Sequence, residues 1–216
     1  SPFAEVLNLD APARTPDALT LLFGVLGVAT AAFQWTVSPW FRTIKIALAE
    51  WLIEHDRFAL LSDDVPWWLL THYPETNDLF TWLDGALIAA YILGGGLLLG
   101  GLLWLTTLAA ARTLGDVRID WQRFALTLTP LAAASVILGL SMLTVTHLKA
   151  EHVWLGWLPA CRIALLALGG GASLWLAAAI GRRAHASLLR IAGATLVTAL
   201  PVGLIAGIWR LVFFVW

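Results

Sequence analysis

Cysteine is nearly absent from this chain, since Cys161 is the only one among 216 residues. One cysteine excludes an intrachain disulfide and any iron–sulfur or zinc site built from four cysteines of these residues. Charge is also scarce, because Asp, Glu, Lys and Arg make up 12% of the residues and the net charge is −1. No basic cluster is large enough to follow a phosphate backbone, which excludes nucleic acid as a partner.

Apolar residues are what the chain has in abundance. Hydrophobic types make up 60% of it and the mean hydropathy is +0.82. These values are far from those of a water-soluble domain of this size. We therefore expect an all-α integral membrane protein, surrounded by the lipid bilayer, with about five transmembrane helices.

The distribution of polar residues divides the chain into four regions. Residues 1–16 form a polar lead-in, and residues 17–37 form the first transmembrane helix, with about the 20 residues that a bilayer requires. Residues 38–78 form an outer interfacial segment. Residues 79–216 form a four-helix transmembrane bundle, in which Pro130 introduces a kink and glycine runs let neighbouring helices approach closely.

An amphipathic helix is predicted from Trp40 to Arg57. At about 100° per residue, its apolar side carries Phe41, Ile44, Leu48, Trp51, Leu52 and His55. Its polar side carries Arg42, Lys45, Glu50, Glu54, Asp56 and Arg57. Such a helix lies along a membrane surface.

Arginine placement predicts the orientation of the chain. Two turns that lie on the same side of a five-helix bundle carry Arg112, Arg118, Arg123, Arg182, Arg183 and Arg190. Because cytoplasmic turns are rich in Lys and Arg, this side is expected to face the cytoplasm. Residue 1 is then cytoplasmic, while the interfacial segment and Trp216 lie outside.

Two ligand sets are compatible with the sequence. His72, Glu75 and Asp78 supply nitrogen and oxygen ligands for a divalent metal, although capping, turn formation and solvation explain the same residues. His55, His72 and His147 are candidate haem ligands on the outer side. The sequence assigns no catalytic residue.

Asp84 and Arg210 are ionisable residues a few positions inside apolar helices. A charge at that depth requires a partner or access to the lipid headgroups. We expect a structural polar cluster in which Asp84 pairs with Arg210, or else with His147 or Arg162. In the alternative, Arg210 reaches the headgroups alone and Asp84 hydrogen-bonds the first turn of its own helix.

Four stretches carry a resemblance to a known family: FQWTVSPWF, LAEWLIEHD, DDVPWWLLTHYPETNDLFTWLDG and LSMLTVT. They resemble the C-terminal membrane half of bacterial polyferredoxins related to NapH and CcoG, most closely the FtrD-like type. The resemblance implies 4Fe-4S clusters in a region upstream of Ser1, since no cluster cysteine has a counterpart here. It also implies a multi-pass protein of the bacterial inner membrane.

Two functions follow as expectations. The resemblance implies the membrane domain of an electron-transfer protein that passes electrons toward a periplasmic metal-handling partner, such as an iron-uptake component. Composition by itself favours a non-redox scaffold or accessory subunit of a larger complex. Both functions require protein partners in the membrane.

Overall fold

The computed structural model describes residues 7, 13–34, 39–61, 81–115, 120–150 and 156–212, without the side chains of 39–42 and 142–150. Every regular element within these ranges is helical. Four of the described helices are long and apolar enough to cross a membrane, and a bent pair makes a fifth if it counts as one span. The predicted all-α membrane fold is therefore confirmed.

The first span is one continuous helix over Thr15–Gln34. It comprises α2 (Thr15–Leu19), the π-helical segment η1 (Thr20–Ala29) and α3 (Thr30–Gln34). Pro16 lies in its first turn, where a missing N–H costs nothing. The π-helical geometry is unusual over such a length, and it occupies the part of the span that contacts the next transmembrane helix most closely.

Two short elements precede that next helix. The helix α4 (Pro39–Glu54) overlaps the amphipathic helix predicted from Trp40 to Arg57, starting one residue earlier and ending three residues sooner, and is followed by the 3₁₀ turn η3 (Phe58–Leu61). At the end of α4, Asp56 has φ 53° and the N–H of Arg57 donates to the carbonyl of Leu52 at 2.8 Å. This Schellman-type bond terminates the helix.

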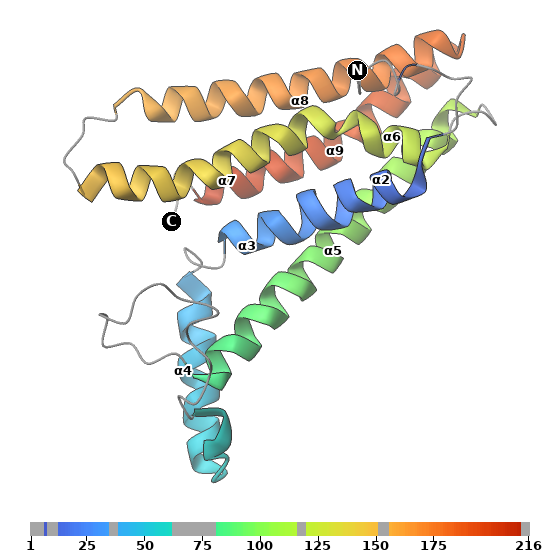
Figure 1. Cartoon of the computed structure of the whole chain (residues 1–216). Coiled ribbons are helices and arrows are strands. Elements are labelled where there is room, and N and C mark those ends of the chain that lie inside the picture. The colour runs from blue at the N-terminus through green and yellow to red at the C-terminus, as the bar shows by residue number, and fades with distance from the viewer. Residues whose placement is uncertain are drawn as a thin grey trace.

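The longest helix is α5, Trp82–Leu114, with 33 residues. At 1.5 Å per residue it measures about 50 Å, which exceeds the roughly 30 Å hydrocarbon core. Figure 1 shows that α5 runs obliquely and diverges from the other long helices toward α4. Its start therefore lies at a corner of the molecule, away from the bundle.

Glycines bring α5 into close contact with the first span. A Cβ atom added at Gly27 would lie 2.5 Å from the carbonyl oxygen of Gly96, and one added at Gly96 would lie 2.9 Å from the Cα of Val28. One turn further along, a Cβ atom at Gly100 would lie 3.0 Å from the Cα of Phe23. Side chains at these glycines would force the two backbones apart.

The third span is bent by 44° between α6 (Trp121–Thr127) and α7 (Thr129–Ala150). Pro130 has no N–H to donate to the carbonyl of Leu126, and the Thr129 hydroxyl donates to that carbonyl instead, at 2.7 Å. The kink predicted at Pro130 is therefore confirmed. The Thr129 hydroxyl thus replaces the backbone hydrogen bond that Pro130 cannot donate.

The last two spans are α8 (Leu158–Arg183) and α9 (Leu188–Arg210). Gly169 packs against Ala134 of α7, and Gly170 packs against Val202 of α9. Trp209 is fully buried and its indole N–H donates to the Ser135 hydroxyl at 3.1 Å. The bundle core thus combines small-residue contacts with one interhelical hydrogen bond.

One end of the bundle gathers the ends of several helices. The Arg190 guanidinium donates to the carbonyl of Leu114, and that of Arg183 donates to the carbonyl of Leu7. Figure 1 shows the end of α5, the start of α6 and the α8–α9 connection at this same end. The two arginine-rich turns therefore lie on one side of the bundle. Arg118, which belongs to the prediction, lies outside the described residues.

The sides of the bundle are apolar and exposed in the part of the chain that the structure describes. Only 17% of the most apolar window of α5 is buried. Large exposed side chains cover the long helices, among them Leu98, Leu168, Leu188, Leu189 and Leu196. Lipid contact satisfies such surfaces, whereas water does not.

The adjacent residues Gly100 and Gly101 give a matched test of the first contact. Gly100→Ala should lower the stability of the fold by about 1–3 kcal/mol, because its methyl group meets the backbone of the first span. Gly101→Ala should be neutral or stabilise by up to about 1 kcal/mol, because no atom lies within 4 Å and alanine favours helices. Thermal unfolding in detergent, followed by circular dichroism, measures both. Equal shifts would contradict the packing described.

Candidate functional site at the corner between α4 and α5

The first turn of α5 contains a reciprocal capping box. The backbone N–H of Thr81 donates to Oδ2 of Asp84 at 3.0 Å, and the backbone N–H of Asp84 donates to the Thr81 hydroxyl at 3.3 Å. The Thr81 hydroxyl also donates to the same carboxylate oxygen at 2.9 Å. These bonds satisfy amides that a helix start leaves unpaired, and they place a negative charge at the positive end of the helix dipole.

The second oxygen of the Asp84 carboxylate binds α4. Its Oδ1 lies 2.6 Å from the Nζ of Lys45. The Asp84 side chain is 9% exposed and that of Lys45 is 39% exposed, so the pair is shielded from water on the acid side only. One carboxylate therefore caps α5 and ties α4 to it.

This pairing corrects the prediction that Asp84 binds Arg210. Among the described residues, the ion pair of Asp84 is with Lys45, and neither Arg210 nor Arg162 reaches it. The reason is the divergence of α5, which carries Asp84 toward α4 and away from the end of α9 (Figure 1). The alternative prediction, that Asp84 hydrogen-bonds its own first turn, is confirmed. The side chain of His147 lies outside the described residues.

Sequence reasoning missed Lys45 and Thr81. The spacing Thr81-x-x-Asp84 was a sufficient signal for the cap, because a Thr followed three residues later by an acid is a capping-box pattern. Lys45 gave no such signal. It belongs to the polar side of the predicted amphipathic helix, and only the approach of α4 to α5 makes it the partner of a buried acid.

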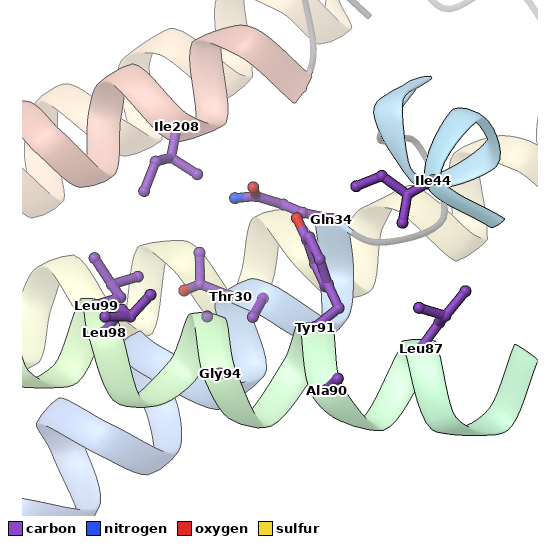
Figure 2. A pocket seen from close by; sticks show the side chains of 12 residues that line it. Thr30, Gln34, Ile44, Leu87, Ala90, Tyr91, Gly94, Leu98, Leu99 and Ile208 are labelled. Atoms are coloured by element: carbon purple, nitrogen blue, oxygen red, sulfur yellow. The ribbon is translucent and has the colours of Figure 1, made fainter. Parts of the chain in front are cut away.

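Below this corner lies a cavity of about 520 Å³ between α3, α4, α5 and α9. Its described lining is mostly aliphatic, with Thr30, Gln34 and Tyr91 as polar members. Figure 2 shows the Tyr91 hydroxyl pointing toward the Gln34 side chain. The Thr30 hydroxyl is buried and, within the described structure, has no hydrogen-bond partner. The cavity offers hydrogen bonding but no charged group from its described lining.

The candidate cofactor ligands are not assembled in the described part of the chain. His72, Glu75 and Asp78 lie outside it, and within it no three His, Cys, Asp or Glu residues form a metal-binding group. His55 is exposed, its Nδ1 lies 2.8 Å from the carbonyl of Trp51, and its ring stacks on that indole at 4.3 Å. These local contacts fix the orientation of the His55 ring.

A 4Fe-4S cluster does not fit the residues of this chain. Such a cluster takes four cysteine thiolates, and the single thiol, that of Cys161, is exposed near the start of α8.

The exposed side chains of α4 form two apolar stripes. Ile44, Leu48 and Trp51 lie on one side of the helix and are 42%, 36% and 50% exposed. At about 100° per residue, Ile46 and Ile53 lie on the opposite side, and they are 48% and 52% exposed. The side between the stripes faces the molecule, where Lys45 binds Asp84 and Leu52 is buried.

Removal of the Asp84 carboxylate should destabilise the corner. Asp84→Ala breaks the cap of α5 and its link to α4, and we expect a loss of about 1–3 kcal/mol. Thr81→Ala, which breaks only the cap, should cost about 1 kcal/mol. Thermal unfolding in detergent provides the comparison.

Glu50→Ala is the control, because Glu50 is an exposed acid on α4 and should change stability by less than about 0.5 kcal/mol. If Asp84→Ala were no more harmful than Glu50→Ala, the corner would not depend on this carboxylate.

Comparison with known protein families, with curated proteins and with solved structures finds no match to this chain.

Proposed function

We propose that this chain is the membrane domain of a larger assembly and that α4 holds a partner protein at the membrane surface. The observation that carries this proposal is the pair of opposed apolar stripes on α4. An interfacial helix buries one apolar face in the headgroup region and turns its other face to water. The second stripe is therefore left for a protein.

The assignment of the stripes follows from their composition. Ile44, Leu48 and Trp51 are three successive members of one face, and a tryptophan is typical of the membrane interface. Ile46 and Ile53 then point away from the bilayer. Two exposed isoleucines about two helical turns apart are suited to an apolar contact with another helix or sheet.

The anchoring of α4 supports the same proposal. Because the Asp84 carboxylate joins the start of α5 to Lys45, the helix is held in place before any partner arrives. A surface that is already ordered loses less conformational entropy on binding. The corner is thus suited to docking.

The resemblance to polyferredoxins suggests a more specific form of this proposal. In it, the chain is the membrane domain of an electron-transfer protein of the bacterial inner membrane, and the partner at α4 is a periplasmic metal-handling protein, such as an iron-uptake component. The arginine-rich end of the bundle then faces the cytoplasm, as the positive-inside rule favours. A non-redox scaffold of a larger complex would use the same α4 surface.

Photocrosslinking tests the docking surface. With a photoreactive amino acid in place of Ile46 or Ile53, irradiation of native membranes should give a discrete protein adduct from each position. The same amino acid in place of Leu48, which is exposed on the other stripe, is the matched control and should give lipid adducts only. Absence of a protein adduct from both Ile46 and Ile53, or the same adduct from Leu48, would overturn the proposal.

Absorption spectroscopy separates the two forms of the function. For the electron-transfer form, we expect the purified 216-residue chain to lack iron–sulfur absorption and a longer gene product with upstream cysteines to show it. For the scaffold, neither the 216-residue chain nor the longer gene product should show iron–sulfur absorption. A Soret band from the 216-residue chain would instead assign haem to this chain.

A further inference from the structure

An apolar groove lies between α8 and α9. It measures about 590 Å³ and its described lining includes Leu166, Gly170, Gly171, Leu174, Ala206 and Arg210. We propose that this groove binds one anionic phospholipid, with an acyl chain along the groove and the phosphate at Arg210. The inference does not depend on the proposed function of α4.

The register of the two helices places Arg210 at the mouth of the groove. A Cβ atom at Gly181 would contact Ile191, and one at Gly170 would contact Val202. Both helices advance by the same number of residues between these contacts, in opposite directions, so α8 and α9 are antiparallel. Continuing this register sets Arg210 opposite the first turns of α8, where Arg162 also lies.

The groove has the length of one lipid leaflet. Its lining on α8 extends from Ile163 to Leu174. At 1.5 Å per residue this distance is about 17 Å, close to half of the roughly 30 Å hydrocarbon core. An acyl chain that starts at the membrane surface would therefore fill the groove from end to end.

Two glycines of α8 shape the groove, one at its floor and one at its open side. Gly170 is buried against Val202, which closes the floor. A Cβ atom at Gly171 would meet nothing within 4 Å, so the wall is open to the membrane at that residue. An acyl chain can therefore lie directly against the backbone of α8, as small residues allow in membrane helices.

Charge selects an anionic headgroup. Arg210 is exposed, it is the charged member of the described lining, and the ion pair found among the described residues does not include it. A guanidinium matches a phosphate with two parallel hydrogen bonds. A groove that is charged at its mouth and apolar along its length has the polarity of a phospholipid, whereas an apolar partner helix would leave this charge unmatched.

The experiment uses the full chain in vesicles that contain equal amounts of phosphatidylglycerol and phosphatidylcholine. After extraction in a mild detergent and removal of free lipid, mass spectrometry measures each lipid bound per chain. The unaltered chain should retain phosphatidylglycerol in preference to phosphatidylcholine. Arg210→Gln should lower that preference about fivefold, the effect expected for one basic residue at an anionic lipid surface.

Groove-filling variants test the acyl-chain site separately. Gly171→Leu should lower the amount of both lipids several-fold, and Ala167→Leu, at another position of the lining, should do the same. Gly193→Leu is the matched control, because Gly193 lies on α9 outside the groove lining and also has no atom within 4 Å of its built Cβ. It should retain lipid as the unaltered chain does. Circular dichroism and gel filtration establish that each variant is folded.

Several results would overturn the proposal. They are retention of detergent only, equal retention of the two phospholipids by the unaltered chain, and an unchanged lipid preference in Arg210→Gln. Undiminished lipid in both folded groove-filling variants would also overturn it. So would a dimer whose α8–α9 faces cover each other without lipid.

Discussion

The close contact between the first span and α5 is the constraint on which the rest of the structure depends. Lipid tails are as apolar as leucine, so burying leucine between helices in a bilayer gains little, and association relies on close packing. Gly27, Gly96 and Gly100 provide that packing, because their missing side chains let backbone meet backbone. Leucines consequently remain on the outside of the bundle, facing lipid.

The same contact explains why Asp84 and Lys45 meet at the corner between α4 and α5. Since α5 is held near its middle by the first span, its start diverges from α7, α8 and α9 (Figure 1). The Asp84 carboxylate in the first turn of α5 is buried, and its cationic partner among the described residues is Lys45 of α4. The cap from Thr81 and the ammonium of Lys45 compensate the charge, and this compensation fixes the position of α4.

The two proposed binding surfaces follow from what the bundle leaves uncovered. On α4, two apolar stripes are exposed, and an interfacial helix buries only one of them in the bilayer. Between α8 and α9, glycines leave a groove that ends at the guanidinium of Arg210, which is not part of the ion pair found among the described residues. Each surface therefore combines an apolar area with a feature that limits what can cover it. On α4 this feature is that the second stripe points away from the bilayer, and in the α8–α9 groove it is the charge of Arg210.

The sequence determined the class of the fold, because apolar runs of membrane length leave few alternatives, and it located the bend at Pro130, where a local hydrogen bond is lost. It also contained the cap of α5 in the spacing of Thr81 and Asp84. Only the tertiary structure decided the partner of Asp84. Depth in an apolar helix favoured Arg210 as the partner and gave no signal for Lys45, because the partner depends on the direction in which α5 leaves the bundle. That direction is set by glycine contacts between segments about 70 residues apart in sequence, which no local pattern encodes.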